Sequence, residues 1–181
     1  MNPTAIEINV EHAAWSEAVP DLEALITRMA EAALADADCD LGDDPLEISV
    51  VLADDATVQV LNREWRGKDK PTNVLSFASL DDDDAPRPPG APLLLGDIIL
   101  AFETCRAEAV EQGKPMAEHL SHLVVHGVLH LLGYDHEEDE IEAEEMERLE
   151  AAILARFGIA DPYLPSLDDN PTESNIAEGG R

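Results

Sequence analysis

The feature that most constrains this chain is the stretch HGVLHLLGYDH at residues 126–136, where three histidines lie among leucine, valine and glycine. His126 and His130 are four residues apart, so on a helix their side chains leave the same face. Gly133 predicts a helix end in a left-handed turn, after which His136 can return toward the same point. Three imidazole nitrogens with an open fourth position are typical of a catalytic zinc site. The stretch therefore predicts one Zn²⁺ per chain, bound by His126, His130 and His136 at the end of a buried helix.

The alternative is three histidines that are each satisfied by a separate hydrogen bond. The spacing of four and six residues is the general frame of metzincin-type zinc sites, which favours the metal. Zinc peptidases, however, place a glutamate directly after the first histidine as general base, and here that residue is Gly127. A zinc peptidase stays an alternative that lacks its base. The chemistry would then rest on the metal, which lowers the pKa of its bound water toward about 7, and on charge stabilisation from elsewhere.

Further polar residues surround the predicted ligands. His119 and His122 lie on the same helix face as His126, too far along the axis to share one metal with His130. We interpret them as supports of the site or as the lining of a cleft; ordinary polar positions near a helix start are the alternative. Asp135 could hold a ligating imidazole in the right tautomer, or could be a solvated turn carboxylate.

The hydrophobic periodicity predicts a single α+β domain, with a small mixed sheet of about four strands covered by helices on at least one face. The apolar residues of the last helix that are expected to face inward are Ile141, Met146, Leu149, Ile153, Leu154 and Phe157. The strands are expected at 5–10, 46–53, 71–79 and 93–101, and the helices at 20–37, 54–66, 103–113, 115–133 and 137–158.

The catalytic domain is expected to span residues 1–158, and residues 159–181, with three prolines and a polar end, are expected to form a flexible acidic tail. The chain contains no run of 18 apolar residues, so no membrane span is expected, and the N-terminus has no pattern of a secretory signal. Cys39 and Cys105 lie in separate contexts, which favours free thiols and a cytoplasmic location.

The chain is strongly acidic, with a formal net charge of −29. Taken alone, this charge argues against a nucleic-acid partner, because like charges repel at long range. The distribution is uneven, however: four of the eleven Lys and Arg residues lie in REWRGKDK, namely Arg63, Arg66, Lys68 and Lys70. A solvated loop is the simplest interpretation of this segment on charge alone.

Three segments together resemble the YbeY family of bacterial rRNA maturation factors, which are metal-dependent endoribonucleases. They are NREWRGKDKPTNVLSF at 62–77, LGDIIL at 95–100 and HLVVHGVLHLLGYDH at 122–136, in the family order. The resemblance implies a zinc-dependent enzyme that cuts single-stranded RNA, with roles in processing the 3′ end of 16S rRNA and in ribosome quality control. It implies as partners rRNA, the small ribosomal subunit and its proteins, and an Era-type GTPase.

The resemblance also extends to single residues. His126, His130 and His136 match the family's zinc ligands, and Arg66 matches an arginine that the family needs for activity. Asp97 matches a Gly-Asp pair of the family, and Asn73 stands where many members carry aspartate. We place Asn73 and Asp97, with His122 and Asp135, in the surroundings of the ligands.

The resemblance changes the interpretation of REWRGKDK. Arg66 could clamp a phosphate and stabilise charge in the transition state, while Arg63, Lys68 and Lys70 could hold flanking phosphates. With seven aromatic residues in the chain, an extensive base-stacking platform is not expected. A non-catalytic ribosome-assembly factor with a structural zinc is a third hypothesis, motivated by the charge of −29.

Overall fold

The computed structural model describes residues 4–37, 44–78, 91–134 and 140–163. Over these residues the chain forms four strands and six helices, and the expected α+β class is confirmed. The strands are β1 (Thr4–Val10), β2 (Leu46–Ala53), β3 (Val74–Ala78) and β4 (Leu93–Ala101), and the helices are α1 (Ala14–Ala18), α2 (Leu22–Asp36), α3 (Asp55–Arg66), α4 (Phe102–Gln112), α5 (Met116–Leu131) and α6 (Glu140–Ala155).

The strands form one mixed sheet in the order β1-β2-β4-β3. β1 and β4 run parallel to β2, and the edge strand β3 runs antiparallel to β4. Parallel neighbours need a crossover, and α2 provides it between β1 and β2.

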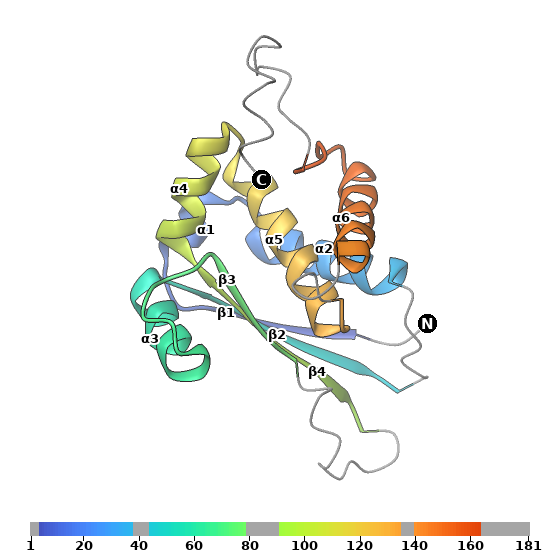
Figure 1. Ribbon diagram of the computed structural model, residues 1–181, viewed down its shortest axis with the longest axis horizontal. Helices are drawn as coiled ribbons and strands as arrows, with labels where there is room; N and C mark the ends of the chain where they lie inside the picture. Colours follow the sequence, from blue (N-terminus) through green and yellow to red (C-terminus); the bar gives the residue numbers. More distant parts are fainter. Residues whose placement is uncertain (1–3, 38–43, 79–90, 135–139, 164–181) are drawn as a thin grey trace.

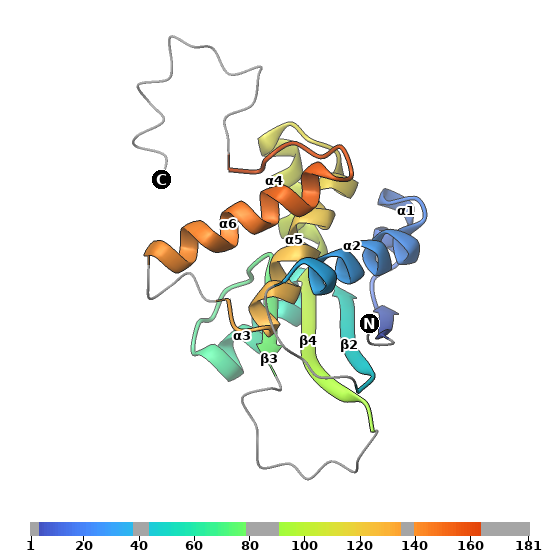
Figure 2. The ribbon, with the colours of Figure 1, turned by 90° about the vertical axis from the view of Figure 1, so that its right-hand side faces the viewer.

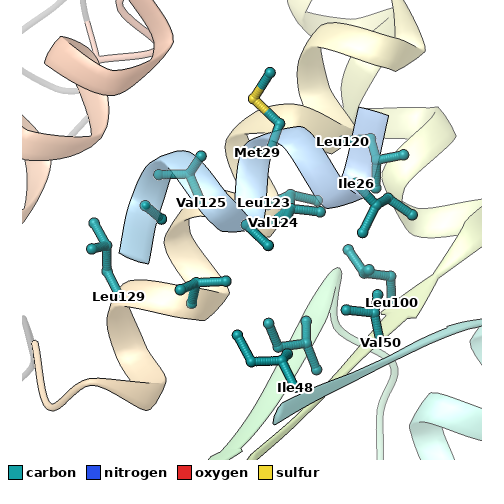
Figure 3. Close-up of a cluster of buried hydrophobic side chains, with 14 of the residues drawn as sticks. Ile26, Met29, Ile48, Val50, Leu100, Leu120, Leu123, Val124, Val125 and Leu129 are labelled. Atoms are coloured by element: carbon teal, nitrogen blue, oxygen red, sulfur yellow. The ribbon is translucent and has the colours of Figure 1, made fainter. Parts of the chain in front are cut away.

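Helices cover both faces of the sheet (Figure 1). The hydrophobic core is large on one face and small on the other. On one face, Ile48, Val50 and Leu100 pack against α2 and α5 in a large core with residues such as Ile26 and Val124 (Figure 3). On the other face, α3 covers a small cluster that consists of Ala53, Val58, Leu75, Ile99 and Ala101. The strand alternation explains this division, because successive side chains of β2 and β4 point to opposite faces.

Gly96 in β4 allows α5 to approach the sheet closely. Its φ is +147°, and a Cβ built there would lie 2.2 Å from the Phe77 carbonyl oxygen and 2.7 Å from Leu131 Cδ2. Any side chain at this position would push the end of α5 away from β3 and β4. The glycine thus sets the depth at which the histidine-bearing helix lies.

Most of the predicted elements are confirmed. Asp54 caps the start of α3, where its carboxylate accepts the Thr57 N–H at 2.9 Å. The sequence did not indicate α1, a single short turn anchored by the buried Trp15, whose indole donates to the Ala53 carbonyl at 2.8 Å. The expectation that Ile141 faces inward was wrong: it is 66% exposed, because the first turn of α6 extends past the helices that α6 packs on (Figure 2). The other five residues predicted to face inward on this helix are buried or packed against the core.

Three further expectations have partial outcomes. Residues 159–163, the start of the expected tail, lie beside α6: Ile159 packs against the core, and Tyr163 contacts Glu150 of that helix. Residues 164–181 lie outside the described residues, so the tail stays a prediction. Cys105 is a buried free thiol, and Cys39 lies outside the described residues. Among the described helices, none has the length and apolar character to cross a membrane.

Candidate metal centre

One face of α5 carries a row of four histidines, His119, His122, His126 and His130. Successive rings lie edge to face, with centroids 6.3, 6.2 and 5.9 Å apart. The row follows from the sequence positions, because residues three and four apart share a helix face. The sequence-predicted ligands His126 and His130 are therefore neighbours, and His122 is the next ring along.

Glu150 of α6 lies opposite this row and is fully buried. One carboxylate oxygen meets His122 Nε2 at 2.8 Å, and the other meets His126 Nδ1 at 2.8 Å. Burial alone would raise the pKa of Glu150, but the hydrogen bonds and charges of the two histidines outweigh it and lower the pKa to about 2. Glu150 is therefore an anion that is held in place by two imidazoles.

Tyr163 completes this cluster from the segment after α6. Its hydroxyl donates to Glu150 Oε1 at 2.5 Å and lies 3.2 Å from His122 Nε2. Burial, followed by the charge of Glu150, raises the pKa of the Tyr163 hydroxyl, so it remains a hydrogen-bond donor. We call His122, His126, Glu150 and Tyr163 the Glu150 cluster.

The Glu150 cluster could hold a metal ion: one ligand atom from each of His122, His126 and Glu150 lies within 4.8 Å of the others. This set overlaps the sequence-predicted ligands at His126 only. His130 is the next histidine along the row, and His136 and Asp135 lie outside the described residues. The donor set of imidazoles and one carboxylate suits zinc and other divalent transition metals.

The position where a peptidase would carry its glutamate faces the sheet. A Cβ on Gly127 would lie 3.1 Å from two side-chain atoms of Ile98, and Gly127 is buried. A larger side chain here would enter the core and would not reach the histidine row. The missing base is therefore a consequence of packing, which argues against the peptidase alternative.

A second carboxylate and histidine meet nearer the start of α5. His119 Nε2 lies 2.8 Å from Glu108 Oε1 of α4, and the same oxygen accepts Asn73 Nδ2 at 3.0 Å. We call His119, Glu108 and Asn73 the Glu108 cluster. Asn73 thus supports a neighbour of the predicted site. Asp97 shares the sheet face of Ile99, opposite to the face that α5 covers, so the structure does not bring it to the histidine row.

Comparison with known proteins identifies the family. The family model described as endoribonuclease YbeY matches residues 7–158. The chain belongs to the YbeY family. A relative from Paramagnetospirillum magneticum, named endoribonuclease YbeY, is 67% identical over 87% of this chain and 94% of the relative. Another of that name, from Rhodospirillum rubrum, is 52% identical over 89% of this chain and 82% of the relative.

The fold is similar to a solved structure as well. The solution structure of a Thermotoga maritima protein matches with a TM-score of 0.51 and 25% identity, over 92% of this chain and 97% of that chain. The YbeY family that the motifs indicated is thus confirmed. The family match ends at residue 158, so Tyr163 lies beyond it.

The basic segment lies at the end of α3. Arg63 and Arg66 occupy its last turn, Gly67 ends the helix in the left-handed conformation, and Lys68 and Lys70 follow, all four cations being exposed. Arg63 lies 3.7 Å from Asp69. α3 covers the sheet face opposite to α5, and both helices contact the edge strand β3 (Figure 1). A substrate that reaches both Arg66 and the histidines would therefore cross the β3 edge.

Sequence reasoning missed Glu150 and Tyr163. Glu150 carried a signal, since it stands within the apolar stripe of α6, four residues after Met146 and three before Ile153, where a lone carboxylate needs a partner. Tyr163 carried none, because it follows the last predicted helix in a segment rich in proline and acidic residues.

Proposed function

We propose that this protein is a zinc-dependent endoribonuclease, a hydrolase of RNA phosphodiester bonds that acts in rRNA maturation. The supporting observation is a histidine row held by a buried carboxylate in a chain of the YbeY endoribonuclease family. The specific reaction proposed is processing near the 3′ end of 16S rRNA, with a role in ribosome quality control. The proposed location is the cytoplasm.

The proposed zinc ligands are His126, His130 and His136. The adjacent rings of His126 and His130, with centroids 5.9 Å apart, support the first two. For the third, the φ of +101° at Gly133 is the left-handed conformation that commonly ends a helix, which allows the chain to change direction before His136. A bound zinc ion supplies Lewis-acid activation of a water molecule and of the phosphate. Glu150, His122 and Asp135 would fix the orientation of the ligating imidazoles from the side away from the metal.

The protein groups proposed to act on the RNA come from the end of α3. Arg66 would stabilise the negative charge that develops on the phosphate, since a guanidinium offers two parallel donors to two oxygens. Arg63, Lys68 and Lys70 would bind flanking phosphates without reading the bases. Asp97 lies on the sheet face that α3 covers. Asn73 would act on the site indirectly, by donating a hydrogen bond to Glu108.

The proposed partners are rRNA, the small ribosomal subunit, some of its proteins, and an Era-type GTPase. The net charge of −29 suits basic ribosomal proteins and leaves the α3 end as a basic contact for RNA. A ribosome-assembly factor with a structural zinc is the second candidate, and the same charge favours it.

The decisive experiment combines metal analysis with cleavage of a 16S precursor by wild type, His130→Ala and Arg66→Ala. We expect one zinc per wild-type chain, loss of zinc in His130→Ala, and retained zinc with about 100-fold or more loss of cleavage in Arg66→Ala. Arg106→Ala on α4 is the matched control, because Arg106 is exposed on another helix. Zinc without any cleavage by wild type would favour the assembly factor, and unchanged turnover in Arg66→Ala would remove Arg66 from the chemistry.

A further inference from the structure

We propose that Glu150 and Tyr163 are positioning residues of the metal centre: Glu150 orients His126, and Tyr163 holds Glu150. The inference rests on the proposed function for the identity of the metal. It goes beyond it in assigning a role to Tyr163, which lies outside the family match.

Glu150 determines which nitrogen His126 presents to a metal. Its oxygen holds Nδ1 at 2.8 Å, so that nitrogen carries the proton and Nε2 is the ligand atom. A carboxylate on the second nitrogen of a ligating histidine fixes the tautomer and the ring orientation, and it raises the basicity of the ligand. The side chain of His126 is 18% exposed and that of Glu150 is buried, so Glu150 contacts the ring from the interior of the protein.

The short contacts favour this role over direct ligation by Glu150. Two ligand atoms each about 2.1 Å from a tetrahedral zinc lie roughly 3.4 Å apart. The two imidazole-to-carboxylate distances are 2.8 Å, which is the length of a charge-assisted hydrogen bond. An ion placed among His122, His126 and Glu150 would have to push these pairs apart.

Tyr163 fixes the carboxylate itself. Its hydroxyl reaches Glu150 Oε1 at 2.5 Å, on the oxygen that also meets His122, while the other oxygen remains on His126. The segment that carries it is tied down: the Ile159 N–H donates to the Leu154 carbonyl, and the Tyr163 N–H donates to Asp161 Oδ1 at 2.8 Å. Through Tyr163, the described segment after α6 thus contributes to the centre.

The test measures zinc affinity by competition with a chelator and records the visible spectrum of the Co²⁺-substituted protein. The variants are Tyr163→Phe, which removes only the hydroxyl, Glu150→Gln, and the double variant. Glu144→Gln is the matched control, because Glu144 is an exposed carboxylate on the same helix. Unfolding of each metal-free variant is measured separately, so a loss of stability is not read as a loss of affinity.

We expect Glu150→Gln to weaken zinc binding by about 10- to 100-fold and to shift the Co²⁺ spectrum. Tyr163→Phe should weaken it by a smaller factor, about 3- to 10-fold, and this factor should vanish in the Glu150→Gln background, because Tyr163 acts through Glu150. Wild-type affinity in Tyr163→Phe, or an undiminished effect in the double variant, would overturn the inference. If Glu150→Gln does not fold, Tyr163→Phe still decides whether the hydroxyl matters.

Failure of the proposed function would give other results than failure of the roles proposed for Glu150 and Tyr163. His130→Ala would then keep zinc, or wild type would bind zinc and leave the precursor uncut. An effect of Tyr163→Phe on zinc binding would stand even if no RNA were cleaved.

Discussion

The two faces of α5 serve opposite purposes although they alternate along the same sixteen residues. The sheet-facing side is apolar and closely packed, with Gly127 against Ile98 and Val124, Val128 and Leu131 in the core. The other side carries four histidines, and carboxylates from α4 and α6 meet three of them. The packed face gives the helix one position, and this lets the polar face hold its hydrogen bonds at fixed lengths.

The carboxylates that meet the polar face of α5 differ in burial. Glu150 is fully buried and is shared by two histidines and Tyr163, whereas the side chain of Glu108 is 34% exposed and contacts one histidine and Asn73. The same pairing of a carboxylate with histidine thus occurs at a buried and at a partly exposed position. A buried charge loses more when a partner is removed, because water cannot replace the partner.

The largest expected effect is on the packed face. Gly127→Glu would place a charge against Ile98 in the core, and we expect a loss of more than about 4 kcal/mol in the free energy of unfolding, measured by urea denaturation. Gly127→Ala is the graded control: the three atoms nearest to its Cβ belong to the Ile98 side chain at 3.1–3.3 Å, and the cost of this close contact is offset by about 1 kcal/mol of helix propensity. A stable Gly127→Glu protein with peptidase activity would mean that the two faces have been assigned wrongly.

A smaller effect is expected in the dry part of the polar face. In the metal-free protein, Glu150→Gln should lower the free energy of unfolding by about 2–4 kcal/mol, because the charged hydrogen bonds to two imidazoles are weakened. Glu144→Gln should change it by less than about 0.5 kcal/mol, since that carboxylate is exposed. Equal losses in both variants would remove the distinction between buried and exposed carboxylates.

The smallest effect is expected at Glu108. Glu108→Gln should cost about 1 kcal/mol or less, because part of the carboxylate reaches water. Measuring the free energy of unfolding of Glu108→Gln and Glu150→Gln in the same buffer tests whether the more buried carboxylate contributes more stability. A loss larger than that of Glu150→Gln would reverse the comparison.

The pH dependence at Glu108 has a defined sign. Burial raises its pKa, but hydrogen bonds from His119 and Asn73 and the charges of the histidines outweigh it, so the folded-state pKa is lowered. Its stabilisation is therefore present above the ordinary value of 4.5 and is lost as pH falls through the lowered pKa. Between pH 5 and pH 3 the wild type should lose slightly more stability than Glu108→Gln, and parallel curves would contradict this.

Particular residues show how far local patterns reach. The strands, the helices other than α1 and the histidine row were predictable, because each depends on spacing along one element. The inward position of Ile141 was predicted wrongly, because periodicity does not say where a helix runs past its support. Glu150 could have been suspected as a carboxylate in an apolar stripe, but its partners could not be named.

The sequence by itself determined the α+β class, the family, and the alignment of His122, His126 and His130 on one helix face. The class follows from hydrophobic periodicity, the family from the motifs that resemble it, and the alignment from helical geometry. Only the tertiary structure decided what meets that face. The contacts of Glu150 with His126 and His122 and of Tyr163 with His122 join residues 24, 28 and 41 apart in the chain, and they exist because α6 and the segment after it pack against α5. Such distances depend on how helices pack together, and no local pattern records them.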